Sequence, residues 1–81
     1  MRLLPRRRMT DVQEVAIRGD MIRLGQLLKL AGIVGGGGDA KALLAEGHVH
    51  VNGEPESRRG RQLHAGDEIT IGDVAIRVGG G

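Results

Sequence analysis

The sequence contains no phenylalanine, tyrosine or tryptophan among its 81 residues. Proteins that bind single-stranded nucleic acid usually stack the bases on aromatic side chains, and RRM and OB-type modules depend on such platforms. This chain therefore cannot bind single strands by aromatic stacking.

Cysteine is also absent, which excludes a disulfide framework and a metal site built from thiolates. No apolar run approaches the roughly 18 residues that a membrane-spanning helix needs. The first eight residues carry the positive charge of a signal-peptide n-region, but no apolar segment follows them. We expect a cytoplasmic protein that does not contact a membrane.

Residues suited to catalysis are few. Ser57 is the only serine, and no histidine or acid stands near it at the spacing of a known nucleophile motif. Glu54 and Glu56 are expected to share one strand face in a short exposed hairpin, with no room for a cleft. A single domain of this size rarely builds a substrate pocket. We predict a protein that is not an enzyme, with no cofactor and no small-molecule substrate.

Positive charge is concentrated in two acid-free stretches, although the formal net charge is only +2. One lies within the first eight residues and the other spans residues 57–66. Their basic residues are Arg2, Arg6, Arg7, Arg8, Arg58, Arg59, Arg61 and His64. Such local patches attract polyanions even when the whole molecule is nearly neutral. The alternative is that these are solvated surface side chains.

The first half of the chain carries a helical pattern of apolar residues, at Leu24, Leu27, Leu28 and Ala31. We predict a helix over residues 23–31, with Asp20 as its N-cap. A second helix is predicted over residues 39–46 and ends at Gly47, where a C-cap needs positive φ. The glycines of residues 35–38 form either an anion-binding nest or a simple connector.

The second half alternates with a period of two, which is typical of strands. Val49 and Val51 share one face, and Asn52-Gly53 suits a tight hairpin turn. Strands are predicted over residues 12–17 (an edge strand), 48–52, 54–57, 61–63, 68–71 and 74–78, with Ile69, Ile71, Val74, Ile76 and Val78 pointing inward. The fold class is α+β, with two short packed helices against a small, mainly antiparallel, curled sheet.

An ordered set of motifs carries a family resemblance. Its parts are Arg23-Leu24, Leu27-Leu28, Ala40-Lys41, Leu44, GHVHVNG at 47–53, RRGR at 58–61 and GDEI at 66–69. The set, which covers roughly residues 22–71, resembles the S-four (S4) RNA-binding domain with its αL-type helix pair. The chain is most similar to small stand-alone bacterial members. S4 domains often carry Asp and then a basic residue where Gly25 and Gln26 stand here.

The resemblance implies binding of structured RNA, ribosomal or ribosome-associated, by a protein that is expected to be a monomer. Without aromatic side chains, recognition would use charge, shape and 2′-hydroxyl groups. The start of the second helix, the outward side of the strand after it and the arginine segment would form one concave basic surface. The implied RNA-binding residues are Arg23, Lys41, His48, His50, Asn52, Arg58, Arg59 and Arg61.

Each of these residues also has a simpler interpretation. Lys41, expected in the first turn of the second helix, could pair locally with Asp39 or Glu46 instead of a phosphate. Asn52 would shape the turn or donate a hydrogen bond to a sugar or base. His48 and His50 could be plain surface residues, and with His64 they have a weak metal-site spacing, although we predict no metal.

A second hypothesis comes from the other end of the chain. The VNGE and GDEI segments with terminal glycines also resemble ubiquitin-like sulfur carriers, which would make the protein a sulfur carrier or another protein-interaction module that uses its C-terminal Gly-Gly. Two adjacent helices and an arginine segment are not expected in such carriers. For the domain organisation we expect a flexible basic arm over residues 1–11, one domain over residues 12–78 and a flexible glycine tail over residues 79–81.

Overall fold

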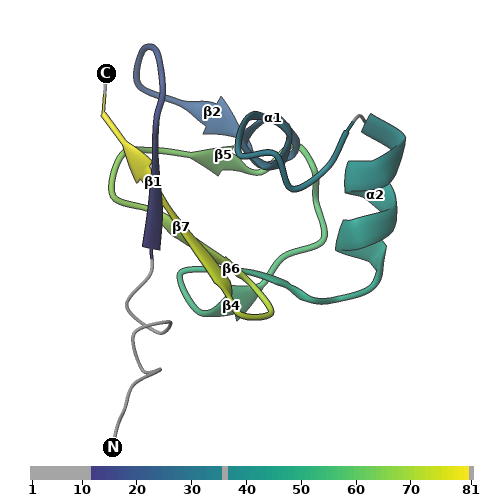
Figure 1. The fold of residues 1–81 in the computed structure, drawn as a ribbon. Coiled ribbons are helices and arrows are strands. Elements are labelled where there is room, and N and C mark those ends of the chain that lie inside the picture. Colours follow the sequence, from purple (N-terminus) through teal and green to yellow (C-terminus); the bar gives the residue numbers. More distant parts are fainter. Residues whose placement is uncertain (1–11, 36, 81) are drawn as a thin grey trace, which may run out of the picture.

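The computed structural model describes residues 12–35 and 37–80 (Figure 1). Its elements follow the order β1 (Val12–Ala16), β2 (Ile22–Arg23), α1 (Leu24–Leu30), α2 (Gly37–Ala45), β3 (Val49–Val51), β4 (Glu54–Pro55), β5 (Gln62–Leu63), β6 (Glu68–Ile71) and β7 (Val74–Gly79). This arrangement confirms the predicted α+β class with two helices and a mainly antiparallel sheet. The predicted basic arm of residues 1–11 lies outside the described residues.

Five strands form the main sheet in the order β1-β7-β6-β3-β4, and β2 pairs with β5 in a separate two-stranded ribbon. All pairs are antiparallel except β1 with β7, which run parallel. The predicted edge strand near the N-terminus is confirmed, because β1 lies at one end of the sheet. Figure 1 shows α1 between the β2–β5 ribbon and α2, so both flanks of this helix face other elements.

The end of α1 follows from its glycine. Gly32 has φ +78°, and its N–H donates to the Lys29 carbonyl at 3.1 Å. The next N–H, of Ile33, donates to the Leu28 carbonyl at 2.9 Å. These two bonds form the Schellman motif, in which glycine at C′ adopts the left-handed conformation and satisfies the last carbonyls.

The start of α1 differs from the prediction. Asp20 is not the N-cap, because Ile22 and Arg23 form β2 and the helix begins at Leu24. Arg23 is the N-cap residue and makes no side-chain capping bond. The first helical N–H groups bond instead to backbone carbonyls from a distant loop, which makes a side-chain cap unnecessary.

The core lies between the helices and one face of the main sheet. Leu24, Leu27 and Leu28 of α1 are fully buried, as their spacing predicts. They belong to one cluster with Leu44 of α2 and with the inward residues Val49, Val51, Leu63, Ile69, Ile76 and Val78. Val74, predicted to point inward, is 41% exposed because it lies at the first position of β7, directly after the turn at Gly72.

Two boundaries near glycines also differ. The second helix is predicted from residue 39, but α2 begins at Gly37, so Lys41 lies beyond its first turn. The glycine run is therefore partly helical and not only a connector. At the other end, β7 extends through Gly79, which is buried and pairs with Ala16 of β1. None of the described helices has the length and apolar character needed to span a membrane.

Candidate nucleic-acid interface

The loop of residues 56–61, called here the arginine loop, is attached to the start of α1 by its backbone. The Leu24 N–H donates to the Arg61 carbonyl at 2.8 Å, and the Gly25 N–H donates to the Arg59 carbonyl at 2.9 Å. The Arg23 guanidinium adds a bond of 3.1 Å to the Gly60 carbonyl. Two otherwise unpaired helix N–H groups are thereby satisfied, and the arginine loop is fixed against the helix.

Gly25 permits this close approach. A Cβ built at this position would lie 2.8 Å from Cγ of Arg59 and 3.4 Å from its carbonyl oxygen. No real Cβ comes so close to another heavy atom, so a side chain here would displace Arg59. The glycine at the place where S4 domains often carry Asp is therefore explained by the stem of Arg59, which occupies the space above it.

Glu56 organises the rest of the arginine loop. Its side chain is only 7% exposed, and its two carboxylate oxygens accept five hydrogen bonds. The donors are the backbone N–H groups of Ser57 and Arg58, Nε and Nη2 of Arg58, and Nη1 of Arg61, at 2.8–3.1 Å. The prediction of an exposed carboxylate in the hairpin is wrong, because β4 ends at Pro55 and Glu56 turns into the protein.

This network fixes the charge of Glu56 at neutral pH. The side-chain and backbone hydrogen bonds from Arg58, followed by the bond from Arg61, hold the pKa of Glu56 far below its ordinary value. Glu56 in turn raises the pKa of Arg58. Arg58 and Arg61 thus already share one negative charge, whereas Arg59 has no ion-pair partner among the described residues.

A hollow of about 530 Å³ opens where α1, α2 and the arginine loop meet. It is lined by Arg23, Gly25, Gln26, Lys29, Ala40, Arg59 and Gly60. Three of these seven residues are cations, and none is an acid. We call this region the basic hollow. Because cations that surround a concavity reinforce one another's potential, the basic hollow is suited to a phosphate-bearing ligand.

The predicted site residues divide into those that the structure brings together and those that it does not. Arg23 and Arg59 line the basic hollow, and Arg58 and Arg61 stand in the same loop but bond to Glu56. Lys41 is exposed on α2, next to the lining residue Ala40, and is not itself part of the wall. None of the ion pairs in the described part of the chain involves Lys41, so the local pairs considered for it are not formed.

Asn52 is engaged in its own turn. It adopts φ +52°, confirming the left-handed conformation expected at this hairpin. Its side-chain amide donates to Asp67 at 3.2 Å, and its side-chain oxygen accepts from the Glu68 N–H at 3.0 Å. Burial raises the pKa of Asp67, but the bonds from the His64 N–H and from Asn52 outweigh this and leave the pKa below its usual value. Asn52 therefore links two turns of the sheet.

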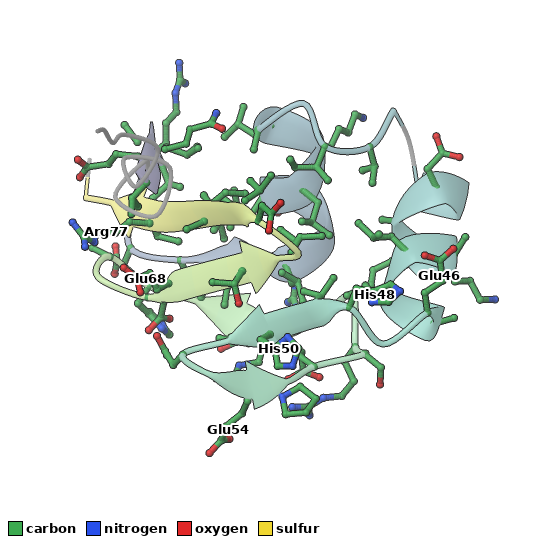
Figure 2. The ribbon with its side chains drawn as sticks, turned by 60° about the horizontal axis from the view of Figure 1, so that its bottom comes forward. Glu46, His48, His50, Glu54, Glu68 and Arg77 are labelled. Carbon is green, nitrogen blue, oxygen red and sulfur yellow. The ribbon has the colours of Figure 1, made fainter. Side chains whose placement is uncertain are left out.

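The histidines lie apart from the basic hollow. Figure 2 shows His50 on the sheet face that points away from α1, and His48 near Glu46 at the end of α2. Val49 and Val51, on either side of His50, are buried against the core, so the alternation of the strand places His50 on the opposite face. Among the described residues, no group of three or more His, Cys, Asp or Glu side chains is arranged to hold a metal ion.

The predicted RNA-binding residues did not include Lys29, which is a further candidate for the site. The structure places it in the wall of the basic hollow. A signal was present: Gln26 and Lys29 are three residues apart, which puts them on the exposed face opposite the buried leucines. No pattern in the sequence indicated that Glu56 would be buried.

The sulfur-carrier alternative finds no support in the fold. Both adjacent helices, which are not expected in such carriers, are present. Gly79 belongs to β7, and its carbonyl accepts a 3.1 Å hydrogen bond from the Ile17 N–H. A Cβ at Gly79 would lie 2.9 Å from a carboxylate oxygen of Glu14, so the chain at this glycine is packed within the sheet.

A family model described as the S4 domain matches residues 15–79. The chain is also 51% identical over 57 residues to the probable ribosome maturation protein RlbA of Bacillus subtilis (strain 168). That alignment covers 70% of this chain and 80% of the relative. The family match spans nearly all the described elements, including both helices and the arginine loop, and the chain belongs to the S4 domain family.

Proposed function

We propose that this protein binds structured ribosomal RNA through the basic hollow, without catalysing a reaction. The observation that carries the proposal is the convergence of Arg23, Lys29 and Arg59 on one concavity whose lining contains no carboxylate. Phosphate contacts of this kind supply most of the affinity of proteins for nucleic acid and do not depend on sequence.

Membership of the S4 family and the name of the relative support the same role. The relative is described as a probable ribosome maturation protein, and this chain shares half of the aligned residues with it. A protein that acts on maturing ribosomes meets folded ribosomal RNA as its most abundant polyanion. The lack of aromatic residues also favours recognition of folded RNA over single strands.

The contacts within the arginine loop suggest how the cations would share the binding. Arg59 is exposed, forms no ion pair within the described part of the chain, and its stem lies over Gly25, so its charge is available to a phosphate. Arg58 is 72% exposed and already bonded to Glu56, so it would contribute less. Lys41, Arg58 and Arg61 remain proposed outer contacts, whereas His50, on the far face of the sheet, is left out of this interface.

The proposal is tested by titrating RNA binding against salt. The probes are a fluorescein-labelled hairpin RNA with a 16-base-pair stem and a transcribed ribosomal RNA fragment, both measured by fluorescence anisotropy. Each phosphate contact that a substitution removes should reduce the slope of log affinity against log salt by about 0.7–0.9. We expect Arg59→Ala to remove about one phosphate contact and therefore to reduce the slope by about 0.7–0.9.

Arg77→Ala is the matched control, because Arg77 is exposed and pairs with Glu68 on the sheet, away from the basic hollow (Figure 2). Its slope should equal that of the unmodified protein. The simultaneous change of Arg23, Lys29 and Arg59 to alanine should remove about three contacts. Equal slopes for this triple variant and for Arg77→Ala would refute the proposed site.

A further inference from the structure

A second concavity borders the basic hollow. It lies between α1 and the bend that joins β1 to β2, and its volume is about 670 Å³. Its principal lining residues are Ile17, Arg18, Met21, Ile22, Lys29 and Leu30. We call it the apolar groove. Volumes of this order suit the enclosure of a group the size of a nucleotide or a small ligand.

The apolar groove contains exposed apolar side chains, which a helix face in contact only with water does not require. Three large hydrophobic side chains of the described residues are markedly exposed: Met21 at 37%, Leu30 at 59% and Val74 at 41%. Two of them, Met21 and Leu30, line this one groove. Exposed apolar surface that is gathered in a concavity marks a binding surface more often than scattered residues do.

The groove adjoins the basic hollow, because the two share lining residues. Gln26 and Lys29 line both concavities. The two concavities lie on opposite flanks of the exposed face of α1. Figure 1 shows this helix with β2 and the bend on one flank and α2 on the other. A ligand that contacts Lys29 from the basic hollow is therefore already at the edge of the apolar groove.

The charges on the groove favour a polyanion over a basic partner. Arg18 and Lys29 are its only charged lining residues, and neither forms an ion pair within the described part of the chain. The lining of the groove thus combines apolar side chains with two cations. Nucleotides carry the complementary features, because a base has apolar faces and its phosphate is negative. Aliphatic side chains such as leucine and methionine pack against unstacked bases in proteins that bend nucleic acid, so aromatic residues are not required for such a contact.

We propose, on the basis of the RNA-binding role argued above, that the apolar groove receives an unpaired nucleotide of the same RNA. The duplex part of the RNA lies over the basic hollow, and a base extruded beside it packs on Met21 and Leu30. Its phosphate is held by Lys29 or Arg18. The ligand class is therefore an RNA helix with an adjacent bulge or loop nucleotide, and not an uninterrupted duplex.

Paired RNA probes test this inference with the full-length protein. One is a 16-base-pair hairpin, and the other is the same hairpin with a single bulged nucleotide. Burial of one leucine-sized apolar surface corresponds to about a tenfold gain in affinity, so we expect the bulged hairpin to bind about ten times more tightly. Leu30→Ser and Met21→Ser should each remove most of this preference and leave binding of the plain hairpin unchanged.

Val74→Ser is the matched control, since Val74 is similarly exposed but lies on β7, outside the groove. It should keep the full preference. A second readout uses 2-aminopurine as the bulged nucleotide. Extraction of this base from the stack should raise its fluorescence with the unmodified protein and with Val74→Ser, but not with Leu30→Ser. Thermal unfolding by circular dichroism confirms that each variant is folded.

The outcomes separate the two proposals. Equal binding of the two hairpins by the unmodified protein, or a preference that survives in Leu30→Ser, would overturn the nucleotide site while Arg59-dependent binding stands. Groove variants that bind both RNAs normally but no longer co-sediment with ribosomal particles would assign the groove to a protein partner and also overturn it. If the plain hairpin shows no salt-dependent binding, the proposed function itself fails.

Discussion

Replacement of Glu56 by glutamine tests how the arginine loop is held in place. Glutamine keeps the shape of the side chain but loses the charge, and its NH₂ group must face donors that now contact a carboxylate oxygen. Five hydrogen bonds converge on the two oxygens of Glu56. Charge-assisted bonds at a buried carboxylate contribute about 1.5–3 kcal/mol each, whereas exposed ion pairs contribute about 0–1 kcal/mol.

Solvent exposure of the partners decides between these values. Arg58 is 72% exposed and Arg61 is 33% exposed, so water screens their attraction to Glu56 and can replace part of the stabilisation that glutamine removes. We therefore expect Glu56→Gln to reduce the free energy of unfolding by about 1–2 kcal/mol at pH 7. For a domain of this size that corresponds to a decrease in Tm of about 4–16 °C.

The dependence on pH gives the sharper test. The pKa of Glu56 is depressed in the folded state relative to its ordinary value of 4.5. A depressed carboxyl pKa stabilises the fold at every pH above the unfolded value, and this stabilisation is lost as the pH falls toward the folded value. The difference between the unmodified protein and Glu56→Gln should therefore be complete above about pH 5 and should shrink steadily toward about pH 2.

Urea unfolding followed by circular dichroism at about pH 7, 5, 4 and 3 measures this difference. Glu54→Gln serves as the control, because Glu54 lies two residues away, is exposed and makes no ion pair among the described residues. It should change the free energy of unfolding by less than about 0.5 kcal/mol. A Glu56→Gln difference that stays constant over this pH range, or that matches the Glu54 control, would refute the account of the arginine loop.

Three further substitutions test other parts of the structure. Gly25→Ala should displace Arg59, because the added Cβ would lie 2.8 Å from the Cγ of Arg59. We expect RNA affinity to fall several-fold while Tm changes little, since alanine favours the helix by about 1 kcal/mol relative to glycine. Unchanged affinity in fluorescence anisotropy would contradict this. Leu27→Ala should cost about 2–5 kcal/mol in urea unfolding, because Leu27 is fully buried, and a cost below about 1 kcal/mol would show that the core is wrongly placed. Asn52→Ala should lower the free energy of unfolding by about 1–2 kcal/mol in thermal melting, because it removes two side-chain hydrogen bonds and places alanine in a left-handed conformation. Asn52→Gly should recover part of this loss, because glycine adopts that conformation without strain. Equal Tm values for the two variants would argue against backbone strain.

Local patterns predicted the elements well where each residue's role depends on its near neighbours. The leucine spacing of α1 indicated which face is buried, and Gly47 and Asn52 marked turns because their backbone conformations disfavour most other residues. The alternation of Val49 and Val51 placed β3 correctly in the sheet. These features are decided within four or five residues, so a single sequence contains them.

The parts that were missed depend on contacts between distant segments. Asp20 has the chemistry of an N-cap, but the backbone carbonyls of Arg59 and Arg61, far along the chain, satisfy the start of α1 instead. Glu56 looked like an exposed hairpin residue because nothing nearby in the sequence shows that the chain turns inward after β4. Lys29 lines the basic hollow only because the arginine loop and α2 lie beside α1.

These distant contacts explain why fold and proposed function meet at one place. The loop that supplies Arg59 to the basic hollow also supplies the carbonyls that cap α1, and Glu56 holds that loop by bonding to two of its arginines. A loop with three uncompensated arginines would repel itself and leave the start of the helix, whereas a fully paired loop would have no charge to offer to RNA. One buried acid among three arginines satisfies both requirements, because two cations stabilise the loop and Arg59 stays available for the proposed contact with RNA. An acid introduced beside Arg59 should therefore weaken RNA binding in fluorescence anisotropy without lowering Tm, which would separate the two roles that the loop combines.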